Sequence, residues 1–121
     1  MARILLVEDD DSVRSFVSRA LQMDSHRVVE AEDGEIGLET FVADPDGFDL
    51  VLTDIQMPQM DGIEMSQALA KTVPGQKILM MTGYANQRER ASSTKAIVID
   101  VVQKPFTLTE IRKQVSSALA G

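Results

Sequence analysis

Short apolar segments alternate with helix-type segments along the whole chain, and this alternation restricts the possible folds more than any other feature. The apolar segments have the length and composition of buried strands, and five of them occur, at residues 3–7, 27–31, 48–53, 77–81 and 97–102. Strict alternation of such strands with helices predicts an α/β fold, in which a parallel sheet carries helices on both faces. Right-handed crossovers then favour a doubly wound (βα)5 sheet with the strand order 2-1-3-4-5.

The segments between the strands carry apolar residues on one helical face. This pattern is formed by Val13, Phe16, Val17, Ala20 and Leu21 in the first helix, by Leu38, Phe41 and Val42 in the second, and by Leu108, Ile111, Val115 and Leu119 in the last. Asp33 can cap the second helix, and Thr107 with Glu110 forms a capping box for the last one. A fourth helix beginning near Asn86 is predicted to be weak, because serine and threonine follow. The five strand-helix units together predict a flavodoxin-like domain.

Size and composition exclude several classes of protein. The 121 residues suit one domain spanning residues 1–121, and the absence of cysteine excludes disulfides and thiolate metal sites. No apolar run approaches the roughly 18 residues that span a bilayer, so we expect no membrane segment and a cytoplasmic location. The net charge of −7 argues against nucleic-acid binding and suits a site that attracts a cation. The lone histidine, His26, lies in a predicted turn and cannot form a histidine-rich metal site.

Charged and hydroxyl side chains follow the predicted strands at their carboxyl ends. Glu8 and Asp9 follow the first strand, Asp54 the third, Thr82 the fourth and Lys104 the fifth. In a doubly wound sheet, ligands bind beyond the carboxyl ends of the strands near the switch in strand order, which here lies between strands one and three. We therefore expect the acids to face one another and to hold a cation, and their hard oxygens suit Mg²⁺.

Phosphoryl transfer to a carboxylate would use every member of this group. Such transfer requires an acceptor oxygen, a metal ion that neutralises charge, a second cation on the opposite side and a hydroxyl donor. Asp54, Mg²⁺, Lys104 and Thr82 can fill these roles in turn, while Gly83 leaves room beside the acceptor. The sequence therefore predicts that Asp54 is a phospho-accepting aspartate.

These residues and their flanking motifs resemble the response-regulator receiver (CheY-like) family over essentially the whole chain. The motifs are Glu8-Asp9 after the first strand, Asp54 in Thr-Asp-Ile-Gln-Met-Pro-Gln-Met-Asp-Gly, Thr82 in Met-Thr-Gly and Lys104 in Gln-Lys-Pro-Phe. The resemblance implies that Asp54 accepts the phosphoryl group and that Thr82 and Lys104 hold its oxygens. It also implies a cis bond before Pro105, and a Mg²⁺ site formed by Glu8, Asp9, Asp54 and the backbone carbonyl of Gln56.

The resemblance further implies a signalling role with protein partners. The donor would be a histidine kinase or a histidine phosphotransferase, and the only chemistry would be slow self-phosphorylation and dephosphorylation. The chain ends just past the last predicted helix, so we expect a stand-alone receiver. The Met-Thr-Gly-Tyr-Ala segment and Val101 resemble the CpdR type of single-domain regulator, which controls substrate delivery to a ClpXP-type protease. Many receivers carry a switching Tyr or Phe at the position of Val101, and Tyr84 is a candidate substitute.

Two alternatives share parts of this pattern. A phosphate shuttle or sink without its own output would use the same acceptor chemistry. A phosphatase of the haloacid-dehalogenase type also forms an aspartyl phosphate, but that family needs a second acid two residues after the nucleophile, where this chain has Gln56. Other acids near the pocket have structural interpretations: Asp10 and Asp11 are predicted to begin a helix, and Asp61 before Gly62 is predicted to shape a turn.

Overall fold

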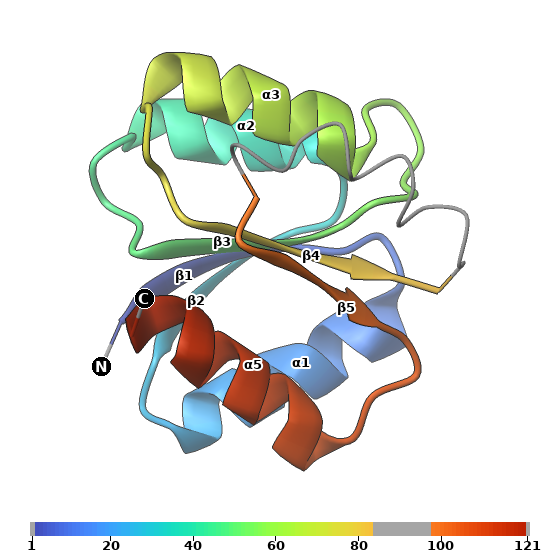
Figure 1. Cartoon of the computed structure of the whole chain (residues 1–121). Coiled ribbons are helices and arrows are strands. Elements are labelled where there is room, and N and C mark those ends of the chain that lie inside the picture. The colour runs from blue at the N-terminus through green and yellow to red at the C-terminus, as the bar shows by residue number, and fades with distance from the viewer. Residues whose placement is uncertain (1, 84–97, 121) are drawn as a thin grey trace.

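The computed structural model describes residues 2–83 and 98–120 as a five-stranded parallel sheet with helices on both faces (Figure 1). The strands are β1 (Arg3–Val7), β2 (Arg27–Ala31), β3 (Leu50–Asp54), β4 (Ile78–Thr82) and β5 (Asp100–Gln103). The helices are α1 (Asp11–Met23), α2 (Gly34–Ala43), α3 (Gly62–Thr72) and α5 (Leu108–Ala120). The strand order is β2-β1-β3-β4-β5, which confirms the predicted topology and the flavodoxin-like fold. The predicted fourth helix lies outside the described residues.

Alternating side chains of the central strands form two cores, one on each face of the sheet. In β1, Ile4 and Leu6 pack with α1 and α5, whereas Leu5 and Val7 pack with α2 and α3. This division follows from the two-residue period of a strand, which sends successive side chains to opposite faces. Figure 1 shows the same arrangement, with α2 and α3 over one face and α1 and α5 over the other. Both faces are covered, which explains why β1, β3 and β4 are almost continuously apolar.

The helix ends are formed largely as the sequence predicts. Asp33 accepts a hydrogen bond from the Ile36 N–H at 2.8 Å and caps α2. Thr107 and Glu110 exchange side-chain-to-backbone hydrogen bonds of 2.9 and 3.0 Å, which is the predicted capping box. Asp61 is the N-cap of α3 rather than only a turn residue, because its carboxylate accepts from the Glu64 N–H at 2.9 Å.

Two apolar residues predicted on inner helical faces are more exposed than the pattern indicates. Val42 in the last turn of α2 is 52% exposed, and Phe16 in α1 is 38% exposed. The Phe16 ring packs against Phe106, with a distance of 6.4 Å between ring centroids. Both residues lie at the margin of an apolar stripe, where the helix turns away from the sheet. No helix in the described part of the chain is long and apolar enough to cross a membrane.

Candidate functional site

The predicted site residues lie together at the carboxyl edge of the sheet. Because Val7 pairs with Thr53 in the register of β1 and β3, the residues that follow them, Glu8 and Asp54, lie level on adjacent strands. On the other side of β3, β4 ends at Thr82, whose backbone carbonyl accepts from the Lys104 N–H at 2.6 Å. The strand order therefore places the lysine segment beside the two acids, although 96 residues separate Lys104 from Glu8.

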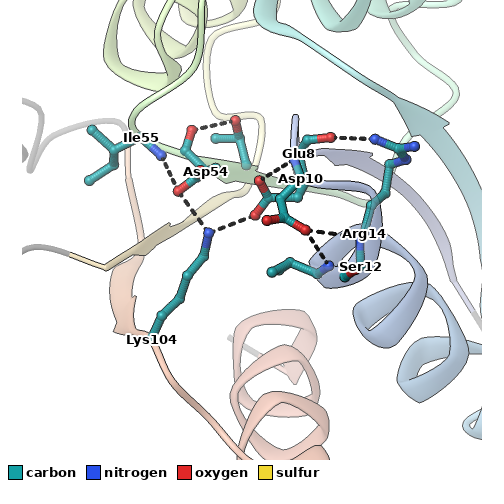
Figure 2. Close-up of polar contacts among 9 residues, drawn as sticks. Glu8, Asp10, Ser12, Arg14, Asp54, Ile55 and Lys104 are labelled. Atoms are coloured by element: carbon teal, nitrogen blue, oxygen red, sulfur yellow. Dashed lines mark hydrogen bonds and ion pairs between the residues drawn. The ribbon is translucent and has the colours of Figure 1, made fainter.

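The Lys104 side chain joins two buried carboxylates. Its Nζ donates to Glu8 Oε1 at 2.7 Å and lies 3.3 Å from Asp54 Oδ1 (Figure 2). The Glu8 side chain is fully buried, and the side chains of Asp54 and Lys104 are 9% and 20% exposed. With so little water nearby, attraction between these charges is stronger than on an open surface. One ammonium group thus holds together two acids that would otherwise repel each other.

Backbone N–H groups orient both carboxylates. The Ile55 N–H donates to Asp54 Oδ1 at 3.0 Å, and the Asp10 N–H donates to Glu8 Oε2 at 3.1 Å. The Asp10 carboxylate itself accepts from two backbone N–H groups in the first turn of α1, which confirms its predicted role at the helix start. Glu8 therefore uses both of its oxygens within the protein, one toward Lys104 and the other toward the α1 cap.

Burial and the neighbouring charges shift the pKa values of Glu8, Asp54 and Lys104. Burial raises the pKa of Glu8 from 4.5 to about 7, although the hydrogen bond from Lys104 opposes the shift. Burial likewise raises the pKa of Asp54 above its ordinary value, against the opposing charge of Lys104. Burial alone would lower the pKa of Lys104, but its hydrogen bond to Glu8 and the charge of Asp54 raise it. The site thus contains more negative charge than Lys104 balances, and this favours a second cation.

The pKa of Glu8 leads to a testable pH dependence. A carboxyl group with a raised pKa holds its proton more tightly in the folded protein, so the folded state loses stability as the pH rises from 4.5 to about 7. We expect Glu8→Gln to remove part of this loss, because glutamine does not titrate. The measurement is the melting temperature at pH 5.5 and pH 8 in EDTA for both proteins. An equal change in melting temperature for the variant and the wild type would contradict the expectation.

A cavity of about 470 Å³ opens at this group. Its lining includes every residue predicted for the site, namely Glu8, Asp9, Asp54, Gln56, Thr82 and Lys104. One carboxylate oxygen from each of Glu8, Asp9 and Asp54 lies within 4.8 Å of the others. Such a set of hard oxygen donors can hold a divalent cation. A second hollow of about 610 Å³ lies near the amino ends of β3 and β4, and none of the predicted site residues lines it.

The remaining predictions about the site have mixed outcomes. The Lys104–Pro105 bond is cis, as the resemblance implies. Gly83 is open within the described part of the chain, because a Cβ atom there would meet no heavy atom of these residues within 4 Å. Val101 is half-buried and packs against the small core of Ile55, Ile63 and Met80. Tyr84 lies outside the described residues, so its predicted role stays a prediction.

Arg14 also lies at the site, and it was not among the residues predicted from the sequence. Arg14, in the second turn of α1, donates from Nη1 to the backbone carbonyl of Glu8 at 2.8 Å. Its side chain is only 16% exposed and also forms ion pairs with Asp11 and Glu30. A basic residue three positions after Asp11 was the available signal, because side chains three or four apart on a helix are neighbours. Its contact with the Glu8 carbonyl depends on the tertiary structure.

Comparisons with known proteins agree with this geometry. The family model for the response regulator receiver domain matches residues 4–116. The response regulator receiver protein CpdR of Brucella abortus is 35% identical over 119 residues, which cover 98% of both chains. The sensor kinase CckA of the same organism is 35% identical over 118 residues, which cover 98% of this chain but 12% of the kinase. A solved structure of the response regulator TrrA from Thermotoga maritima, in complex with Mg²⁺-BeF, is similar with a TM-score of 0.87 and 31% identity, and the match covers 98% of this chain and 99% of that one.

Proposed function

Because the chain belongs to the response regulator receiver domain family, we propose that Asp54 accepts a phosphoryl group from a phosphohistidine partner and that this switches contacts with other proteins. Receiver domains are the signalling domains of two-component phosphorelays. The observation that carries the proposal is the buried Asp54 carboxylate, which lies at the end of β3 beside Lys104 and the acids Glu8 and Asp9. We also propose that residues 1–121 form a single receiver domain, which the family match over residues 4–116 supports.

The transfer itself exchanges one bond to phosphorus for another. The phosphorus–nitrogen bond of the phosphohistidine breaks as a bond forms between phosphorus and one oxygen of Asp54. The imidazole nitrogen leaves with the electron pair and takes up a proton from solvent. Lys104 Nζ, 3.3 Å from Asp54 Oδ1, is placed to pair with the incoming phosphoryl oxygens, and the Thr82 hydroxyl on the next strand can donate to them.

The donor set fits Mg²⁺ by its chemistry. All candidate ligands are hard oxygens, and the carboxylate oxygens of Glu8, Asp9 and Asp54 lie within 4.8 Å of one another. Both Glu8 oxygens already accept hydrogen bonds, so we expect Asp9, Asp54 and the Gln56 backbone carbonyl to be the direct ligands. When bound, the ion would neutralise part of the charge on the transferring phosphoryl group. TrrA, whose solved structure contains Mg²⁺-BeF, supports this choice of metal.

The phosphoryl group would act as a switch through its charge. It adds about −1.5 to −2 charges at pH 7 and draws Lys104 and Thr82 toward the acceptor. Lys104 must then leave Glu8, to which it is hydrogen-bonded in the unphosphorylated protein. Because Lys104 directly follows β5 and precedes α5, its movement would change the surface formed by these elements. Partners that prefer one of the two surfaces would bind one state only.

The similarity to CpdR supports a more specific proposal. The 35% identity to CpdR over 98% of both chains supports a CpdR-type regulator, for which we propose control of substrate delivery to a ClpXP-type protease. The donor would be a histidine kinase or histidine phosphotransferase, and the similarity to the receiver-length part of the CckA kinase supports this class of partner. We propose that the protein acts in the cytoplasm, without nucleic acid, through protein contacts.

A phosphorylation assay tests the acceptor function. Radiolabelled acetyl phosphate, or a phosphorylated histidine phosphotransferase, is incubated with the protein in the presence of MgCl₂ or EDTA. We expect acid-stable, base-labile label to accumulate with Mg²⁺ and to be strongly reduced with EDTA, because the acids then repel the donor. Sustained hydrolysis of phosphate monoesters over many turnovers would instead indicate a phosphatase.

A second assay separates a signalling switch from a phosphate sink. Partners are captured from a cell extract with untreated protein and with protein treated with beryllofluoride, which mimics the phosphoryl group. A switch would bind a protein, such as a ClpX-type unfoldase, in only one of the two states. Rapid loss of label together with identical capture in both states would favour the shuttle or sink.

A further inference from the structure

Arg14 connects three segments at the back of the acidic site. Its Nη1 donates to the Glu8 carbonyl at 2.8 Å (Figure 2). Its Nε lies 3.4 Å from Glu30 Oε1 on β2. It also forms a close ion pair with Asp11 in the first turn of α1. The guanidinium group presents several donors in one rigid plane, so a single side chain can hold all three acceptors. Only 16% of the Arg14 side chain is exposed, so Arg14 is a largely buried residue with a structural role rather than a solvated surface charge.

The carbonyl that Arg14 holds belongs to the peptide between the two acids of the site. The Glu8 N–H is already fixed, because it donates to the Ala31 carbonyl at 3.1 Å. The Glu8 side chain is fixed by Lys104 and by the Asp10 N–H. Since the peptide group is planar, a hydrogen bond to the Glu8 carbonyl also fixes the direction of the following N–Cα bond of Asp9.

The orientation of Asp9 depends on this hydrogen bond to the Glu8 carbonyl more than the orientations of Glu8 and Asp54 do. Its side chain is exposed, and among residues 2–83 and 98–120 no hydrogen bond or ion pair holds its carboxylate. Glu8 and Asp54, in contrast, are oriented by their own side-chain contacts. No side-chain contact among the described residues restrains the Asp9 carboxylate, so its backbone is the restraint that remains, and Arg14 holds the peptide that precedes it.

We propose that Arg14 is a positioning residue for the divalent-cation site, where it aims Asp9 at the cation by holding the Glu8–Asp9 peptide. The proposal rests on the proposed function, because it requires that the acids bind Mg²⁺. Groups that orient metal ligands without touching the metal commonly change metal affinity by 10- to 100-fold when they are removed. Loss of the Arg14 hydrogen bond lets the Asp9 carboxylate point in a wider range of directions. Binding of Mg²⁺ then has to restrict that range, which weakens the binding.

A magnesium titration tests the role of Arg14. The metal-free wild type, Arg14→Met and Arg14→Lys are titrated with MgCl₂ while NMR follows the backbone amides of Asp10 and Ile55, which are hydrogen-bonded to Glu8 and Asp54. We expect Arg14→Met to raise the Kd for Mg²⁺ about tenfold. Arg14→Lys should fall between this variant and the wild type, because one ammonium can reach the Glu8 carbonyl but cannot replace all three contacts.

Arg112→Met provides a matched control. Arg112 forms a bidentate ion pair with Asp24 at 2.6 Å and links α5 to the end of α1, away from the acids. The substitution removes the same charge and a comparable contact, so it should lower the melting temperature while changing the Kd by less than about twofold. An equal weakening of Mg²⁺ binding in Arg112→Met and Arg14→Met would overturn the proposal, since a general loss of stability would then explain both.

The outcomes separate this inference from the proposed function. If the wild type saturates with Mg²⁺ and Arg14→Met has the same Kd, the positioning role is wrong and the receiver function stands. If the wild type shows no saturable shift, both are wrong. Should Arg14→Met fail to fold, Arg14→Lys decides alone, and a Kd equal to that of the wild type would overturn the proposal.

Discussion

Replacing Asp54 with asparagine is expected to abolish phosphoryl uptake and to leave the protein folded. An amide oxygen is a poor nucleophile, and Glu8, the other buried acid beside Lys104, already has both of its carboxylate oxygens in hydrogen bonds. The label from acetyl phosphate or a phosphohistidine donor should fall to background. The melting temperature should not fall, because burial already raises the pKa of Asp54 and thus disfavours its charge.

Asp33→Asn is the matched control for this experiment. It makes the same chemical change at a carboxylate that caps α2 and lies outside the cavity. Asparagine caps helices as well as aspartate does, so this variant should fold and take up label like the wild type. Labelling of Asp54→Asn at the wild-type level would exclude Asp54 as the acceptor.

Gly62→Ala is expected to lower the stability of the protein strongly. A Cβ atom at this position would lie 2.1 Å from the backbone oxygen of Asp54 and 3.0 Å from its carbonyl carbon. Neither partner can move easily, because Gly62 N–H donates to the Ile55 carbonyl at 2.8 Å and Asp54 belongs to the central strand β3. We expect the free energy of unfolding to fall by about 3 kcal/mol, which lowers the melting temperature by roughly 10 °C.

The close approach also couples the start of α3 to the acceptor. Any shift that relieves the clash displaces the end of β3, so the folded fraction of Gly62→Ala should also take up label more slowly. Gly83→Ala is the control, because its added Cβ meets no atom of residues 2–83 or 98–120 within 4 Å, and its stability should change by less than about 0.5 kcal/mol. Urea unfolding measures both variants, and a Gly62→Ala protein as stable as Gly83→Ala would contradict the expectation.

The fold was predictable because its determinants are local and periodic. The five apolar segments and the helical stripes specify the type of each element, and the handedness of crossovers then limits the order of the strands. The strand boundaries differ from the prediction: the third strand begins at Leu50 rather than residue 48, and the described part of the fifth begins at Asp100. Strand ends depend on pairing with neighbours, which an apolar run does not specify.

The residues that form the site could also be predicted from the sequence. Parallel strands bring their carboxyl ends to one edge, so acids, threonine and lysine that follow the strands must meet there. All six predicted residues line the same cavity. Their chemical roles stay predictions until the phosphorylation and magnesium experiments are done.

The sequence alone determined that Asp54 ends a strand, which residues lie near it, and which sheet brings them together. Residue type and the order of the segments in the chain are enough to predict these three features. Only the tertiary structure decided that Lys104 pairs with Glu8 at 2.7 Å, that burial brings the pKa of Glu8 to about 7, and that Arg14 holds the Glu8 carbonyl. It also decided that a Cβ at position 62 would strike β3. These features depend on distances and directions between residues far apart in the chain, and the packing of helices on the sheet sets them.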